Sequence, residues 1–299
     1  MQQQKEEEKE EQLLQQRKQK KLFSTKPPQI SLAVLFTGLI LMIAATISAP
    51  MVAVVYAANI QGTPGDDTLN GTPNADTING LEGNDKLFGK TGNDILDGDK
   101  GSDEMHGGNG NDQINDGNDE ADATNKVYAG SGNDNIDVGT TTGTGISYYI
   151  YGESGSDHIK VIAIEAYVYG GFNHDTIYCT AQFCAIEGNE GHDEIHIEPL
   201  DVMNYALGGS GNDEIYSTGA GELQGNDGND YLYGAADMFG GEGDDILEGV
   251  HPFTQYFGGA GADTFECSSE WPHETVHDYN PAEGDKIVNI EDCETVERI

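Results

Sequence analysis

A nine-residue repeat is the feature that most constrains what this chain can fold into. From Gly62 six units follow one another without a gap, reading GTPGDDTLN, GTPNADTIN, GLEGNDKLF, GKTGNDILD, GDKGSDEMH and GGNGNDQIN. The register returns at residues 129–137, 152–160, 170–178, 188–196, 208–216, 225–233, 240–248 and 258–266. In all 14 units the sixth residue is Asp and the eighth is apolar. So short a period predicts a solenoid built from stacked copies of one unit.

The unit itself suggests how such a solenoid is built. Its glycines permit the positive φ angles of a tight turn, and its last three residues form a minimal strand whose middle residue points inward. Two units make one coil, so Asp residues 18 positions apart stack at a strand spacing of about 4.8 Å. Carboxylates that close repel one another unless a cation lies between them. Oxygen ligands on flexible turns favour calcium over magnesium.

Successive Asp residues fall alternately on two edges of the coil, and we predict all 14 as calcium ligands. The continuous edge carries Asp76, Asp94, Asp112, Asp134, Asp157, Asp175, Asp193, Asp213, Asp230, Asp245 and Asp263. The degenerate edge carries only Asp67, Asp85 and Asp103 before eight irregular segments take over. Each irregular segment keeps an apolar residue next to last, which predicts a strand without a calcium turn: Val127, Ile150, Val168, Ile186, Ala206, Leu223, Met238 and Tyr256.

These units resemble the G-G-x-G-x-D-x-U-x nonapeptide of the repeats-in-toxin (RTX) family over roughly residues 62–290. The resemblance implies an all-β fold, a right-handed parallel β-roll that binds several Ca²⁺ ions. Residues 276–290 resemble the segment that often closes such rolls, where a last strand and an Asn-Pro turn cover the open end. We therefore expect a calcium-binding roll at 59–266 and a capping segment at 267–299.

The charge of the chain limits its partners. The sequence has 53 acidic and 14 basic residues, and its net charge is −39. Most of this negative charge lies after residue 58, whereas residues 1–58 are slightly basic. A field of that sign repels nucleic acid and attracts cations. We expect calcium and no nucleic acid as partners, and a largely unfolded chain without the ions.

The N-terminus indicates export. A charged head at residues 1–29 contains a basic cluster and precedes the uncharged run at 30–49, so the head is expected inside the cell and the repeats outside. The segment 30–58 fits both a cleaved signal peptide and a retained membrane anchor. The protein is thus expected to be secreted, or anchored to the cell membrane and facing outward.

Four cysteines in an exported chain favour disulfides, with three connectivities open. Proximity in the sequence favours Cys179 with Cys184, which takes the place of a ligand Asp, and Cys267 with Cys293 across the cap. Free buried thiols are the alternative.

The string HETVH, His273 to His277, matches the H-E-x-x-H zinc-peptidase pattern. That chemistry needs a helix, which places both His side chains on one face, with Glu274 as the base. Pro272 precedes the string, Asn280-Pro281 follows it, and the resemblance predicts a strand here.

We expect no catalytic residue and no enzyme domain, because nearly every residue after 60 belongs to the roll. The expected function is an exported calcium-binding module with a structural or binding role at the cell surface or in the medium. A secreted zinc metallopeptidase that uses His273, Glu274 and His277 is one alternative. A surface adhesin that binds a glycan or protein partner through the degenerate edge is the other.

Overall fold

The computed structural model describes residues 56–117, 119, 122–139, 144–198, 204–219, 221–234, 237–250, 253–268, 270 and 273–298. The expected head at 1–29 and almost all of the segment 30–58 lie outside these residues. Within the described part of the chain there is no helix at all, and hence none that could span a membrane. The strands belong to one compact unit, Val55–Ile299.

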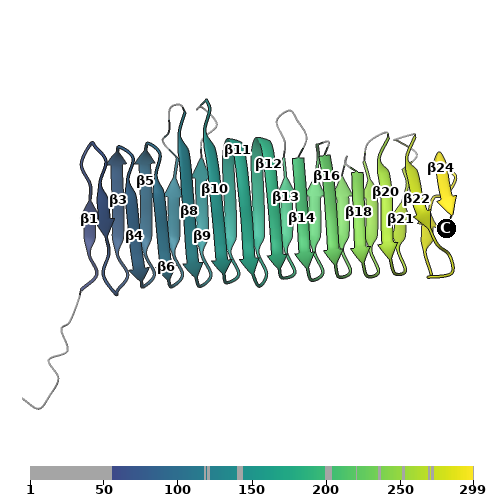
Figure 1. Ribbon diagram of the computed structural model, residues 1–299, viewed down its shortest axis with the longest axis horizontal. Helices are drawn as coiled ribbons and strands as arrows, with labels where there is room; N and C mark the ends of the chain where they lie inside the picture. Colours follow the sequence, from purple (N-terminus) through teal and green to yellow (C-terminus); the bar gives the residue numbers. More distant parts are fainter. Residues whose placement is uncertain are drawn as a thin grey trace, which may run out of the picture. The chain divides into compact units, whose positions relative to one another are not determined.

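The fold is an all-β parallel roll, as the repeat predicts. Its strands lie side by side in chain order along the long axis of the roll (Figure 1). Each pairs in parallel with the strand one coil before and one coil after it, which produces two sheets. The first sheet contains β1 (Asn59–Gln61), β3 (Thr77–Glu82), β5 (Ile95–Lys100), β7 (Gln113–Asp116), β9 (Asn135–Gly139), β13 (Glu194–Ile197), β15 (Glu214–Ser217), β17 (Tyr231–Gly234), β19 (Ile246–Gly249), β21 (Thr264–Glu266) and β23 (Lys286–Val288).

The second sheet faces the first across the core. It contains β2 (Thr68–Asn70), β4 (Lys86–Thr91), β6 (Glu104–Asn109), β8 (Thr124–Ser131), β10 (Ser147–Ser154), β14 (Asn204–Ser210), β16 (Gly221–Asp227), β18 (Asp237–Glu242), β20 (Gln255–Ala260), β22 (Thr275–Tyr279) and β24 (Thr295–Arg298).

Two long strands belong to both sheets. β11 (His158–Phe172) and β12 (Thr176–Glu190) pair with each other in parallel, through His158–Ala163 in the first sheet and Glu165–Phe172 in the second. Between these halves the strands cross the degenerate edge without a glycine turn. The two sheets are therefore joined at this point into one continuous ladder.

The core is built on a double row of inward apolar side chains, which the middle strands widen with further buried residues such as Val138 and Val161. In the first sheet the register aligns Ile78, Leu96 and Ile114, all fully buried. In the second sheet the eight residues predicted from the irregular segments are fully buried, which confirms that these segments kept the inward strand residue: Val127, Ile150, Val168, Ile186, Ala206, Leu223, Met238 and Tyr256.

Both ladders continue into the expected cap. β23 pairs with β21, and β24 pairs with β22, although the nonapeptide pattern ends at Glu266. The Cys267–Cys293 disulfide, with an S–S distance of 2.07 Å, ties this segment to the last regular coil. The C-terminal segment is thus built as further half-coils in the same register.

Candidate metal-binding edges of the roll

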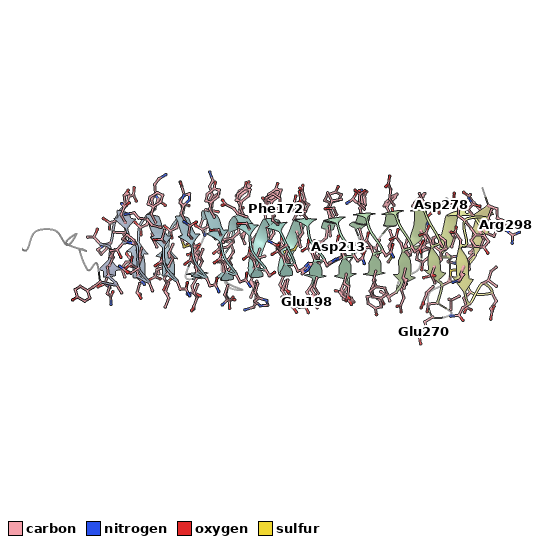
Figure 2. The ribbon with its side chains drawn as sticks, turned by 90° about the horizontal axis from the view of Figure 1, so that it is seen from below. Phe172, Glu198, Asp213, Glu270, Asp278 and Arg298 are labelled. Carbon is pink, nitrogen blue, oxygen red and sulfur yellow. A yellow bond between two sulfur atoms is a disulfide. The ribbon has the colours of Figure 1, made fainter. Side chains whose placement is uncertain are left out.

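The Asp side chains of the continuous edge are joined into one ladder. From Asp76 to Asp245, the main-chain N–H of each Asp donates to Oδ1 of the next Asp along the edge, over 2.7–3.0 Å. Asp213 lies between the two sheets, whereas Glu198 lies on the outside (Figure 2). The structure thus brings the eleven predicted residues of this edge together in the predicted order.

The second carboxylate oxygen of most of these residues is left without a partner. Nine Oδ2 atoms of this edge are buried and accept no hydrogen bond from any described residue, namely those of Asp94, Asp112, Asp134, Asp157, Asp175, Asp193, Asp213, Asp230 and Asp245. On the degenerate edge, the Oδ2 atoms of Asp85 and Asp103 are in the same state. A buried, unpaired carboxylate oxygen is costly, so a recurring set of them is the arrangement expected of cation ligands.

Nearly every unpaired oxygen faces a space that the first glycine of its unit keeps open; the exception is Asp134, whose unit begins with Ala129. A methyl group added at Gly89 would lie 2.5 Å from Oδ2 of Asp94 and 2.5 Å from the carbonyl oxygen of Gly107, one coil later. At Gly170 the corresponding distances are 2.6 Å to Oδ2 of Asp175 and 2.8 Å to the carbonyl oxygen of Gly188. At most of these glycines, a carboxylate oxygen and a carbonyl oxygen of the next coil therefore converge. These are the hard oxygen donors that Ca²⁺ prefers.

Burial disfavours the charged form of the ladder carboxylates when no cation is bound. Burial is the main cause that raises the pKa of Asp175 to about 8; the hydrogen bond from the Asp157 amide opposes it, and the nearby carboxylates of Asp157 and Asp193 add to it. Burial likewise raises the pKa to about 7 at Asp103, Asp157, Asp193, Asp230 and Asp245, and to about 6 at Asp112 and Asp263. A bound cation would supply the positive charge that keeps these groups ionised.

The first Asp on each edge differs from the others. Oδ2 of Asp67 accepts hydrogen bonds from the amide and hydroxyl of Thr63, over 2.6 and 2.9 Å. Oδ2 of Asp76 accepts one from the amide of Thr72. Burial raises the pKa of Asp76, but the Thr72 and Ala58 amides outweigh it and leave the pKa lowered. At both positions a threonine in the second place of the unit already satisfies the carboxylate.

On the degenerate edge, other residues take the ligand position after Asp103. The amide of Asp103 donates to Oδ1 of Asn125 over 2.7 Å, and the register then continues through Tyr148, Ala166 and Cys184. Cys184 is bonded to Cys179, with an S–S distance of 2.02 Å. Both disulfides thus have the pairing favoured by sequence proximity, and all four cysteines are paired.

One member of the continuous ladder was missed from the sequence. The amide of Asp263 donates to Oδ1 of Asp285 over 3.1 Å, and the amide of Asn280 donates to Oδ2 of Asp285 over 2.6 Å. Asp285 is followed by Lys286 and Ile287, the D-x-U pattern of every unit, and this signal could have identified it. Because the Asn280 amide bonds its second oxygen, Asp285 ends the ladder.

The HETVH string forms no helix: its last three residues begin strand β22, in agreement with the predicted strand, and His273 and Glu274 precede that strand. Glu274 is fully buried and accepts hydrogen bonds from the Tyr256 hydroxyl, over 2.9 Å, and from the Ser268 amide, over 2.7 Å. His273 instead pairs with Glu294, and His277 with Glu297. Across the described part of the chain, no three His, Cys, Asp or Glu side chains form a metal-binding group. The three residues therefore do not adopt the one-face arrangement that the zinc hypothesis needs.

Comparison with known families agrees with this geometry. The family model of the RTX calcium-binding nonapeptide repeat matches the chain in four copies, at residues 58–87, 79–114, 217–237 and 238–249. No curated protein matches the chain.

Proposed function

Because this chain carries the RTX calcium-binding nonapeptide repeat, we propose that it is an exported module that folds on Ca²⁺ outside the cell and serves a structural or binding role without catalysis. The observation that carries the proposal is the series of buried, unpaired Oδ2 atoms, most of which face a carbonyl oxygen of the next coil across a glycine. We assign the predicted Asp residues as the calcium ligands. Asp67 and Asp76 differ from the rest, because their Oδ2 atoms already accept hydrogen bonds from threonines. Bound calcium would neutralise the stacked carboxylates and join neighbouring coils.

Export is supported by two features of the chain and by the calcium concentration outside the cell. The basic head precedes an uncharged segment, the two disulfides suit an oxidising compartment, and extracellular calcium is high enough for modules with Kd of about 10⁻⁴ to 10⁻³ M. The segment 30–58 would act as a signal peptide or as the membrane anchor.

A calcium titration of the full-length chain tests the central claim. Circular dichroism should report coil in chelator and a cooperative gain of β signal between about 0.1 and 1 mM calcium. Magnesium at the same concentrations is the matched control and should give little β signal. Equal β content in chelator and in calcium would refute calcium-dependent folding.

An adhesin is the second candidate, and an open groove favours it. The groove has a volume of about 710 Å³ and is lined by Tyr151, Tyr169, Phe172, Glu190 and neighbouring residues. Phe172 is 55% exposed. The groove lies where second-sheet strands lead into turns of the continuous edge, so it would replace the degenerate edge as the binding surface. Aromatic rings beside carboxylates can bind sugars by stacking and hydrogen bonding.

A glycan array probed with the calcium-loaded chain tests this candidate. Binding that Phe172→Ala abolishes would support an adhesin. The matched control is Phe253→Ala, because Phe253 is also exposed but packs on His273 away from the groove. Loss of binding in both variants, or no binding by the unmodified chain, would count against it.

The zinc-peptidase alternative is not favoured, but zinc binding and peptidase activity can test it directly. Zinc should bind no more tightly to the unmodified chain than to a His273→Ala, His277→Ala variant. Peptidase activity that depends on both histidines would overturn the non-catalytic assignment.

A further inference from the structure

Asp116, an acidic residue outside the repeats, lies next to the predicted calcium ligands of the degenerate edge. Asp116 is the last residue of β7, and the register places it beside Gly98, which opens the unit of Asp103. In the preceding coils, the residues at the equivalent position of the register are Gly62, Gly80 and Gly98, and each is the first glycine of a unit. Asp116 therefore occupies a position that glycine holds in the coils before it, and its side chain is only 1% exposed.

The carboxylate of Asp116 points to the ligand space of Asp103. A methyl group added at Gly98 would lie 2.6 Å from Oδ2 of Asp103 and 2.9 Å from Oδ1 of Asp116. In the preceding coil, a methyl group added at Gly80 would instead meet the carbonyl oxygen of Gly98 beside Oδ2 of Asp85. A carboxylate has thus replaced a carbonyl as the second oxygen of the site.

Both converging oxygens are buried and unpaired. Neither Oδ2 of Asp103 nor Oδ1 of Asp116 has a hydrogen-bond partner within the described chain. The remaining oxygen of Asp116 is held by the hydroxyl of Tyr148, which donates to Oδ2 over 3.1 Å. Asp119 lies close by, but the Gly101 amide and the Asn125 side chain bond its two oxygens, over 2.8 and 2.6 Å. Its hydrogen bonds therefore leave the shared space to Asp103 and Asp116.

Two unpaired carboxylate oxygens that face one buried space need either a shared proton or a cation. The same space is occupied by a carboxylate and a carbonyl at sites we assign to calcium, so the cation is the consistent choice.

We propose that Asp103 and Asp116 together bind a Ca²⁺ ion that ends the short ladder of the degenerate edge. This proposal rests on the calcium function proposed above. The second carboxylate gives the site one more negative ligand than its neighbours, and calcium affinity rises with ligand charge. The site should therefore fill first in a titration.

The experiment counts bound calcium on the full-length chain by equilibrium dialysis and resolves the first binding step by calorimetry. Asp116→Asn should bind one ion fewer, and the affinity of the first step should fall at least about tenfold. The matched control is Asp122→Asn, which removes one exposed charge from the same segment, at a φ of 54° that asparagine tolerates. It should leave both quantities unchanged.

The outcomes separate this site from the general function. An unmodified chain that binds no calcium overturns the proposed function and this site with it. An unmodified chain that binds calcium, together with an unchanged ion count in Asp116→Asn, overturns only this site and indicates a shared proton. If Asp116→Asn loses its β signal in saturating calcium, it does not fold and cannot test the site. The variant Asp116→Glu is then used in its place. Its longer carboxylate should weaken the first step at least about fivefold, and an unaltered first step would overturn the site.

Discussion

The main-chain amide of Asp157 donates a 2.8 Å hydrogen bond to Oδ1 of Asp175, its counterpart one coil later, while Oδ2 of Asp175 remains buried and unpaired among the described residues. One carboxylate therefore has two separable roles. One oxygen sets the alignment of neighbouring coils, and the other is available to a cation. An asparagine keeps an oxygen for the first role but loses the charge needed for the second.

Asp175→Asn tests that separation. We expect one or two fewer bound ions and a higher calcium midpoint, because Asp175 lies between two neighbouring sites on the edge. At a calcium concentration about 100 times Kd, each lost site removes about 3 kcal/mol of linkage free energy. Ion counting and calcium-dependent unfolding give the two quantities. Glu187→Gln on the outer surface of the second sheet is the control and should change stability by no more than about 0.5 kcal/mol. Equal effects of the two variants would contradict the assignment of the continuous edge.

Gly89→Ala tests the space beside the ligand. The added methyl would lie 2.5 Å from both Oδ2 of Asp94 and the Gly107 carbonyl oxygen, so it would block that site. We expect about one ion fewer and a higher calcium midpoint. Gly65→Ala is the matched control, since a methyl group there meets nothing within 4 Å. The interpretation fails if both alanine variants bind calcium as the unmodified chain does.

The calcium-free chain should fold better in acid. The pKa of Asp157 is raised to about 7 and that of Asp175 to about 8 in the fold, against about 4 in an unfolded chain. Between these values the folded state holds more protons, so the free energy of unfolding falls as pH rises from about 4 to 8. In chelator, lowering the pH from 8 to 5 should therefore increase the β signal in circular dichroism.

With calcium present, the pH dependence should have the opposite sign. Protons and calcium compete for the same carboxylates, so the calcium midpoint should rise as the pH falls from 8 to 6. A midpoint that does not depend on pH would argue against the buried Asp ladder as the binding site.

The two disulfides should stabilise the roll unequally. Cys267 and Cys293 are 26 residues apart, whereas Cys179 and Cys184 are 5 apart. In the chain-entropy account, replacing the longer link by two serines should cost about 3.5 kcal/mol and replacing the shorter one about 2 kcal/mol. Denaturant unfolding in saturating calcium measures both. A larger loss from the Cys179–Cys184 pair would mean that local packing outweighs loop length.

Much of the roll could be predicted because one period determines both strand and turn. The place of Asp in each unit fixed which edge it would reach, and the apolar residue next to last fixed the register of all eight irregular segments. Ile186, for example, keeps its alignment with Val168 and Ala206 although its segment has no ligand Asp, because the inward and outward alternation along the strand is unchanged.

What could not be predicted depends on side-chain contacts that the period does not encode. The threonines that bond Asp67 and Asp76 are part of two repeats that otherwise match the pattern. Asp116 lies outside every unit, and only the alignment of β7 with β5 brings it beside Gly98. The groove at Phe172 is lined by residues of successive coils at the 18-residue spacing, such as Ser154, Phe172 and Glu190, but their side-chain types do not repeat and so give no signal in the sequence.

The long strands β11 and β12 have a kinetic consequence. They cross from one sheet to the other through apolar residues and a nearby disulfide, so this part of the degenerate edge needs no ion to hold its shape. In a solenoid, order can begin at one place and spread to its neighbours. The middle of the roll is therefore the expected nucleus, from which calcium-dependent coils would add toward both ends. At limiting calcium, amide hydrogens of β11 and β12 should exchange more slowly than those of β3 or β19.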